Sequence, residues 1–571
     1  MLRKIAAVSY LLCAFFAAAC ALSIASAAQS SRPASPHAQS PSKPKPPKLI
    51  VVISVDQMRA DYLERFAPYE TGGLHFFATQ GADFLNANYQ HLPTETCVGH
   101  TTLLSGRNPS HTGIVSNNWY DRASAKMVYC VDDAEAALVG GTGAPVSPSK
   151  LVGDNFSDWF QKSFPGARVY SFSMKDRAAI LMGGHHPTGV YWFSTQNGAF
   201  VTSRYYQEQL PSWVADFNAR NGADSYAGQD WTPLLDAASP AYHTRESAGS
   251  FPHHMPPDKN PRLYNAVYSA PFGDELLEQF AEAAVTSNQL GANPAHAGVP
   301  DLLEVGFSSN DAVGHAYGPD SPEIADEQIR LDRTLGKMMD SLNARLGAEN
   351  ILWVLSADHG VEPTPEAYNQ LENSTVSARM QMTEPTAAVT AQLNDIFHIA
   401  GPMNWFAAQT DSMWYFNLDE LKTHNISLAD ARSALTHKVH DVPGIEGFYD
   451  TGNLAALKGW QGDLVRKSFF PGRSGDVYYI SKEWTLFGGF RGGTSHSDPW
   501  PYDTHVPVVF AGWGIPAARI SAPIHIADVA PTLAALVGVA IPADEPIDGK
   551  SLKPLLQQKP PIKSSGRGPI N

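Results

Sequence analysis

Cysteine and positive charge are both scarce in this chain of 571 residues. It has four cysteines, and its 41 Lys and Arg residues are outnumbered by 56 Asp and Glu, which gives a formal net charge of −15. This acidic balance argues against a protein that binds duplex nucleic acid, because such a protein needs a basic face. It leaves anionic substrates open, since bound metal ions can reverse the sign of the charge locally. Two cysteines lie near the start, and whether Cys97 and Cys130 pair cannot be inferred from the sequence.

Long apolar runs are also lacking beyond the first residues. The chain begins with Arg3 and Lys4, continues with an apolar run and ends that run on the small residues "ASA". This pattern predicts an export signal over residues 1–27, and therefore a periplasmic or secreted protein without a stable membrane span. An uncleaved membrane anchor is the alternative, because the run is nearly long enough to span a bilayer. A lipoprotein site at Cys20 is less favoured, because "AAAC" lacks the usual large aliphatic residue.

Composition predicts the domain organisation of the rest. Residues 28–48 are rich in Pro, Ser and Lys and predict a disordered linker. We expect a single domain over 49–557 and a flexible tail over 558–571. Two stretches near 191–297 and 363–490 are rich in Trp, Tyr, Pro and Asn and less periodic, and we interpret them as inserted capping segments.

A pattern of buried strands recurs along this domain. "LIVVISVD" is an unbroken apolar run that ends in Asp56, as expected of a strand buried on both faces of a mostly parallel sheet. Similar runs are "ARVYSFSMKDR", "DLLEVGFSSND", "ILWVLSADHG" and "HVPVVFAGWG". Helical patterns lie between them, for example "SPEIADEQIRLDRTLGKMMDSL" with Ser321 and Pro322 at its start. The sequence therefore predicts an α/β fold with three layers, α/β/α, whose strand ends line one crevice.

Carboxylates and imidazoles gather at these predicted strand ends. They are Asp56, Asp311, His315, Asp358, His359 and His496. Divided into two sets of three, these side chains suit two Zn²⁺ ions, each with an open coordination position. Two ions about 4 Å apart can stabilise both the attacking and the leaving oxygen of a phosphoryl transfer. Each fragment alone is a weak signal, because an Asp after a strand often caps a helix. Their joint occurrence carries the hypothesis.

Thr96 allows two interpretations. It stands in "LPTETCVGHTTLLSG", directly ahead of a short apolar helix that Gly106 closes. Taken alone, this position favours a helix N-cap. A hydroxyl at a helix N-terminus also suits a nucleophile that attacks phosphate, because the helix dipole stabilises negative charge there. Beside two zinc ions, one of which can hold its alkoxide, Thr96 would form a phosphothreonine that water then hydrolyses.

Polar donors are needed to balance the charge of a phosphoryl group. Asn117 in "NNW" and Lys175 and Arg177 in "MKDR" supply an amide, an ammonium and a guanidinium. The alternative is that all three are surface or turn residues. Spacing alone does not choose Asn117 over Asn118.

These segments resemble the alkaline phosphatase superfamily, most closely its threonine-nucleophile, phosphate-irrepressible alkaline phosphatases. The matching segments occur in the same order along nearly the whole chain: "VVISVDQMRADYL", "LPTETCVGHTTLLSG", "HTGIVSNNW", "SMKDRAAI", "VGFSSNDAVGHAYGP", "LSADHG" and "GGTSHSDPWPYDTHVPVVF". The resemblance implies two zinc ions per chain, one held with Thr96 by Asp56, Asp358 and His359. It places Asp311, His315 and His496 on the other ion. Phosphoryl binding by Asn117, Lys175 and Arg177 is implied in the same way.

The resemblance also bears on the substrate. The Lys-x-Arg pair accompanies phosphate monoesters in this superfamily, whereas the related phosphodiesterase and nucleotide pyrophosphatase branch lacks it. The lysine also stands where a third, magnesium site lies in other members, so we expect no magnesium requirement. Nearby His505 in "YDTHVP" is a candidate supporting residue. A sulfatase is excluded because "TCVGH" provides no Cys/Ser-x-Pro-x-Arg motif.

We therefore expect an exported, zinc-dependent alkaline phosphatase that hydrolyses small-molecule phosphate monoesters, has an alkaline optimum and is monomeric. The alternatives are a phosphodiesterase or nucleotide pyrophosphatase of the same superfamily and an inactive binding protein of the envelope. The sequence does not identify the natural substrate.

Overall fold

The structure is a computed structural model in which residues 45–220, 222–243, 251–489 and 491–557 are described. Nearly all of them belong to one unit, Pro46–Asn571. The predicted signal, most of the linker and the tail lie outside the described residues. Within the described part of the chain, no helix is long and apolar enough to cross a membrane.

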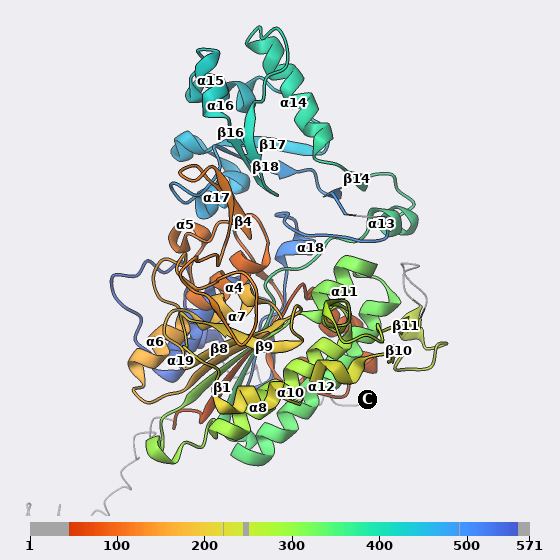
Figure 1. Ribbon diagram of the computed structural model, residues 1–571, viewed down its shortest axis with the longest axis vertical. Coiled ribbons are helices and arrows are strands. Elements are labelled where there is room, and N and C mark those ends of the chain that lie inside the picture. Colours follow the sequence, from red (N-terminus) through yellow and green to blue (C-terminus); the bar gives the residue numbers. More distant parts are fainter. Residues whose placement is uncertain (1–44, 221, 244–250, 490, 558–571) are drawn as a thin grey trace, which may run out of the picture. The chain divides into compact units, whose positions relative to one another are not determined.

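A ten-stranded sheet forms the centre of this unit (Figure 1). Its strands, in spatial order, are β21 (Ala518–Ile520), β2 (Ala82–Phe84), β20 (Val509–Gly512), β13 (Ile351–Ser356), β1 (Leu49–Val55), β12 (Asp301–Phe307), β7 (Val169–Ser173), β8 (Gly189–Ser194), β9 (Ala199–Ser203) and β6 (Leu138–Val139). The strands from β13 to β8 run parallel. The predicted α/β fold with a mostly parallel central sheet is confirmed.

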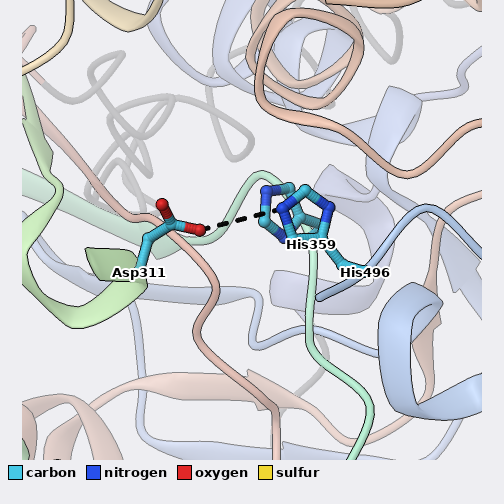
Figure 2. Close-up of side chains that lie close together, drawn as sticks. All are labelled: Asp311, His359 and His496. Carbon is cyan, nitrogen blue, oxygen red and sulfur yellow. Dashed lines mark ion pairs between the residues drawn. The ribbon is translucent and has the colours of Figure 1, made fainter. Parts of the chain in front are cut away.

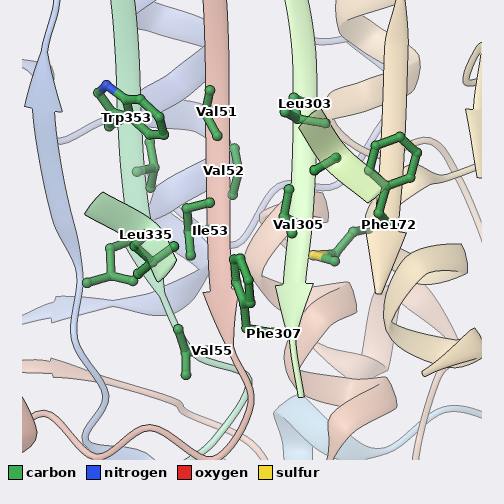
Figure 3. Packing of buried hydrophobic residues seen from close by; sticks show 14 of the residues in the cluster. Val51, Val52, Ile53, Val55, Phe172, Leu303, Val305, Phe307, Leu335 and Trp353 are labelled. Atoms are coloured by element: carbon green, nitrogen blue, oxygen red, sulfur yellow. The ribbon is translucent and has the colours of Figure 1, made fainter. Parts of the chain in front are cut away.

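Helices pack against the sheet in two groups. One group consists of α3 (Gly73–Gln80), α8 (Ser212–Asn218), α10 (Pro271–Asn288), α11 (Ser309–Tyr317) and α12 (Pro322–Leu346). The other consists of α4 (Thr96–Ser105), α6 (Phe156–Ser163), α7 (Asp176–Gly183) and α19 (Val529–Val537). Every residue of β1 is buried, which explains its unbroken apolar sequence. Figure 3 shows Val51 and Ile53 of this strand in one cluster with Leu335 of α12.

The long helix α12 begins as predicted. The Ser321 hydroxyl accepts a hydrogen bond from the Ile324 backbone N–H at 3.1 Å, and Pro322 occupies the first turn. This cap satisfies one of the N–H groups that the first turn leaves unpaired. Other helices are α2 (Tyr62–Arg65), α5 (Pro109–Thr112), α9 (Pro261–Tyr268), α13 (Pro365–Leu371), α14 (Thr383–Ile396), α15 (Leu418–Thr423), α16 (Leu428–His437), α17 (Gly459–Ser468) and α18 (Pro501–Thr504).

The two stretches interpreted as insertions differ in structure. The stretch 363–490 contains a separate antiparallel sheet with its own apolar cluster. Its strands are β15 (Phe406–Gln409), β16 (Met413–Phe416), β18 (Val477–Ser481) and β17 (Ile445–Asp450). The stretch 191–297 instead contributes β9 to the central sheet and α10 to a helical layer. Its interpretation as a pure insertion needs correction, because a short turn pairs β9 with β8.

The last predicted strand has the opposite orientation to its neighbours. "HVPVVFAGWG" contains β20, which pairs antiparallel with β13, so that Val509 lies opposite Leu355 and Gly512 opposite Leu352. The start of β20, and not its end at Gly512, therefore lies at the edge where β13 ends. This reversal brings the loop that contains His496 to that edge.

A hairpin and a disulfide follow α4. β4 (Asn118–Asp121) and β5 (Lys126–Tyr129) pair antiparallel. Cys130, directly after β5, forms a disulfide with Cys97 in the first turn of α4. The pairing that the sequence left open is thus present.

Candidate active site

Four central strands end at one edge of the sheet, and functional side chains follow each of them. Asp56 directly follows β1, and Asp358 lies just beyond β13. Helix α11, after β12, carries Asp311 and His315 one turn apart. Lys175 lies between β7 and α7. Parallel strands thus gather residues that are far apart in the sequence, as predicted for the carboxyl ends of such a sheet.

His100 lies between the first two carboxylates. Its Nε2 is 3.0 Å from Asp56 Oδ1 and 3.5 Å from Asp358 Oδ2, and all three side chains are fully buried. The residue sits one turn after Thr96 in α4, so the helix that presents the threonine also contacts the carboxylates. Sequence reasoning missed His100, although its spacing from Thr96 along a helix was a usable signal.

Gln57 connects the two groups of carboxylates. Its backbone N–H donates to Asp358 Oδ1 and its side-chain amide donates to Asp311 Oδ1, both at 2.9 Å. To do so it adopts a φ of 65°, a conformation that residues other than glycine rarely adopt. Sequence reasoning missed Gln57 too, because nothing in "SVDQM" indicates that this residue forms hydrogen bonds to two separate carboxylates.

The three predicted histidine ligands share one hydrogen-bond arrangement. Each has Nδ1 close to a backbone carbonyl oxygen: Thr494 at 2.9 Å for His315, Gly360 at 2.9 Å for His359 and Thr94 at 2.7 Å for His496. A proton held on Nδ1 leaves the lone pair of Nε2 free for a metal ion. The structure gives Nδ1 of buried His100 no such partner among the described residues. This difference favours His359 over His100 as a ligand.

The nitrogen atoms of these histidines lie close to carboxylate oxygens, and Figure 2 shows Asp311 together with His359 and His496. Asp311 Oδ1 is 3.3 Å from His315 Nε2 and 3.9 Å from His496 Nε2, and Asp358 Oδ2 is 3.3 Å from His359 Nε2. The His359 and His496 rings stack with centroids 3.5 Å apart. Ligands of a tetrahedral zinc ion with bonds of about 2 Å lie about 3.3 Å from one another, so this spacing fits metal coordination.

The grouping in the structure differs in part from the predicted one. Among the described residues, two sets have ligand atoms within 4.8 Å of one another. They are Asp311, His359 and His496, and Asp56, His100 and Asp358. His359 was predicted to join the second set. It lies against His496 and beside Asp358 at once, which places it between the two groups.

Burial and neighbouring charges favour the metal-binding form at four of the six predicted ligands, whereas they raise the pKa of the other two, Asp358 and His315. Burial alone would raise the pKa of Asp56 and Asp311, but the Lys175 ammonium lies 2.9 and 2.7 Å from them and holds both pKa values below the usual range. Burial lowers the pKa of His359 and His496. Ionised carboxylates and neutral imidazoles are the forms that bind metal ions.

Thr96 is the first residue of α4, where Glu95 occupies the N-cap position. The interpretation of Thr96 as a cap is therefore wrong, because its hydroxyl belongs to a residue already inside the helix. The hydroxyl lies 3.5 Å from Arg177 Nη2, and Thr96 is 1 % exposed. Gly99 brings α4 close to the end of β13: a Cβ at this position would lie 2.0 Å from the Asp358 carbonyl oxygen.

The structure also shows where the remaining predicted residues lie. Asn117 Oδ1 accepts a hydrogen bond from the Cys97 backbone N–H at 2.9 Å, whereas Asn118 is exposed. The Asn117 amide group thus lies beside the first turn of α4. His505 Nε2 contacts the Leu85 carbonyl oxygen at 3.1 Å, and His505 is in neither of the two sets of candidate ligands.

Glu95 is a further residue that sequence reasoning missed. Its carboxylate accepts hydrogen bonds from the Ser116 hydroxyl and the Asn117 backbone N–H. Burial, together with neighbouring Asp411, raises its pKa to about 8. It thereby connects the start of α4 to the loop that carries Asn117.

Comparison with known proteins identifies the class of this fold and site. A family profile described as type I phosphodiesterase / nucleotide pyrophosphatase matches residues 50–487. The chain belongs to this family.

Individual relatives narrow this class to the PafA and PhoV type of alkaline phosphatase. Alkaline phosphatase PafA of Elizabethkingia meningoseptica is 32% identical over 521 residues, covering 87% of this chain and 92% of the relative. Alkaline phosphatase PhoV of Synechococcus elongatus is 32% identical over 515 residues, covering 87% and 91%. The crystal structure of wild-type PafA matches with a TM-score of 0.80 over 89% of this chain and 98% of that chain.

Proposed function

We propose that this chain is a metal-dependent phosphatase that hydrolyses phosphate monoesters, with Thr96 as the nucleophile. The observation that carries the proposal is the position of the Thr96 hydroxyl: it is buried at a helix N-terminus, beside the Arg177 guanidinium and at the sheet edge where the carboxylates and imidazoles gather. A helix N-terminus and a guanidinium both favour a phosphoryl dianion.

Relatives support the same assignment. The names of PafA and PhoV state alkaline phosphatase activity for those proteins. A solved PafA variant, also at a TM-score of 0.80, is changed at a threonine, an asparagine, a lysine and an arginine. Their spacings along the chain equal those between Thr96 and Asn117 and between Lys175 and Arg177.

We propose that two zinc ions bind at this edge, one with Asp56, Asp358 and His359 and the other held by three more residues. Those three are Asp311, His315 and His496. The donor set fits, because each imidazole has Nδ1 against a backbone carbonyl oxygen and Nε2 near a carboxylate. When bound, the metal would supply positive charge that lowers the pKa of the Thr96 hydroxyl.

The chain's own residues would carry the remaining steps. Thr96 Oγ1 attacks phosphorus, the ester oxygen leaves as an alcohol, and the resulting phosphothreonine is hydrolysed by water to free phosphate. Arg177 and the Asn117 amide donate hydrogen bonds to the phosphoryl oxygens. The Lys175 ammonium lies between Asp56 and Asp311, where it supplies a fixed positive charge. This placement supports the expectation that no magnesium ion is needed.

Trapping of the covalent intermediate tests this proposal. The zinc-loaded enzyme is mixed with an aryl phosphate and quenched in acid, and the peptide that contains Thr96 is analysed by mass spectrometry. We expect one phosphoryl group on Thr96, two zinc ions per chain, and at least a ~1000-fold loss of turnover in Thr96→Ala. Thr96→Ser, which keeps a hydroxyl, should retain measurable turnover. Turnover that survives in Thr96→Ala would contradict the covalent mechanism.

Three finer properties belong to the same proposal. We propose export, cleavage of the signal and a monomeric state. N-terminal sequencing of the protein recovered outside the cytoplasm tests the first two, and light scattering of the purified protein tests the third. Recovery of a chain that still begins at Met1 in the membrane fraction would favour the anchor.

A further inference from the structure

The hairpin β4–β5 is closed at its base and attached to the start of α4. Cys130, at its end, donates its backbone N–H to the Asn117 carbonyl oxygen at 2.9 Å. The Cys97–Cys130 disulfide and the hydrogen bond from the Cys97 N–H to Asn117 Oδ1 attach this base to the residue after Thr96. The residue at the end of β5, Tyr129, is therefore held at a fixed place relative to Thr96.

The Tyr129 hydroxyl connects this hairpin to Arg177. It donates a hydrogen bond to Asp176 Oδ1 at 2.6 Å and accepts one from Arg177 Nη1 at 3.4 Å. The other terminal nitrogen, Nη2, lies 3.5 Å from Thr96 Oγ1. One nitrogen of the guanidinium is thus held by protein while the other faces the nucleophile.

Orientation matters for this side chain. A free arginine populates many rotamers, and its planar fork of N–H groups binds a phosphoryl group best when one orientation is fixed in advance. The Asp176 carboxylate fixes the Tyr129 proton, so that an oxygen lone pair faces Arg177 Nη1. Burial and Asp176 raise the pKa of Tyr129 above its ordinary value, so the hydroxyl stays protonated at alkaline pH.

We propose that Tyr129 is a positioning residue that orients Arg177 toward the phosphoryl group bound at Thr96, and thereby favours monoesters over diesters. This inference rests on the proposed function. A monoester dianion offers the guanidinium one more charged oxygen than a diester does. Loss of the Tyr129 hydroxyl therefore weakens the enzyme on monoesters more than on diesters.

The test compares Tyr129→Phe with the wild type as full-length, zinc-loaded proteins. The measurements are kcat/KM for an aryl phosphate, kcat/KM for its methyl diester, and inhibition by inorganic phosphate. We expect a roughly tenfold loss on the monoester, less than a twofold loss on the diester, and weaker inhibition by phosphate. Tyr242→Phe is the matched control, because the Tyr242 hydroxyl also donates to an aspartate, Asp326, at 2.6 Å, outside the site. This variant should leave kcat/KM unchanged for both substrates.

A double-mutant cycle separates positioning from a general structural effect. In an Arg177→Ala background, Tyr129→Phe should cost less than twofold on the monoester, because the group that it orients is gone. Equal losses on both substrates, or an undiminished loss in the Arg177→Ala background, would overturn the inference while the phosphatase function stands. An inactive wild type would overturn both.

Discussion

Single residues at the site are arranged so that buried charges compensate one another. Lys175 is almost fully buried, and its ammonium has a carboxylate oxygen on each side, from Asp56 and Asp311. Burial alone would lower its pKa, but these two carboxylates raise the pKa above the ordinary value. An ammonium fixed in this way stays positively charged at neutral and alkaline pH.

Glu70 shows the opposite case, because no positive charge or hydrogen-bond donor in the described part of the chain stabilises its buried carboxyl group. It is 3 % exposed, neither carboxylate oxygen has a hydrogen-bond partner in the described structure, and burial and Asp332 raise its pKa to about 9. The folded state therefore keeps the proton while the unfolded state loses it above pH ~4.5. The free energy of unfolding should fall as the pH rises from about 4.5 to about 9.

The variant Glu70→Gln should remove this contribution to the pH dependence. We expect it to match the wild type near pH 5 and to be more stable by roughly 2 kcal/mol or more at pH 8. Urea denaturation at both pH values measures the difference. A constant difference between variant and wild type at the two pH values would show that Glu70 ionises normally in the folded protein.

Helix α4 is the element that presents Thr96, the proposed nucleophile, and Gly99 sets how closely this helix approaches β13. Alanine usually stabilises a helix interior relative to glycine by about 1 kcal/mol. Here a Cβ would lie only 2.0 Å from the Asp358 carbonyl oxygen, so the helix would have to move. We expect Gly99→Ala to lower both the melting temperature and kcat/KM for a monoester.

Gly143→Ala is the matched control for this variant. A Cβ at Gly143 would lie 3.2 Å from the end of the flexible Leu138 side chain, which can move. Calorimetry and turnover on both variants make the comparison. A Gly99→Ala protein with unchanged stability and turnover would mean that α4 tolerates displacement from Asp358.

The disulfide makes the hairpin β4–β5 and helix α4 one unit. It closes a segment with a sequence separation of 33, and the chain-entropy account assigns such a loop a stabilisation of about 3–4 kcal/mol. A reducing agent should therefore lower the melting temperature of the wild type and leave that of Cys130→Ala unchanged. Equal melting of the wild type with and without the reductant would contradict this expectation.

The elements were predictable from the sequence to different degrees. The all-apolar strand β1 and the capped helix α12 carry their signals locally, in "LIVVISV" and in Ser321 with Pro322. The antiparallel orientation of β20 has no local signal, because an apolar run is compatible with a strand that runs in either direction relative to its neighbours. Only pairing with β13 fixes it.

Across the whole molecule, the candidate site depends on contacts between distant segments. The prediction that carboxylates and histidines gather at one sheet edge follows from the rule that parallel strands share an edge. The supporting contacts do not follow from any rule about spacing. The His496 ring, for example, is oriented by the Thr94 carbonyl oxygen, which lies 402 positions away in the chain.

The central claim is metal-dependent hydrolysis of phosphate monoesters at this edge. The most direct test is kcat/KM for an aryl phosphate and for its methyl diester, measured on one zinc-loaded sample before and after chelation and again after zinc is restored. We predict a large preference for the monoester, loss of turnover on chelation, and recovery with zinc and no added magnesium. A preference for the diester, or turnover that persists after the metal is removed, would contradict the account.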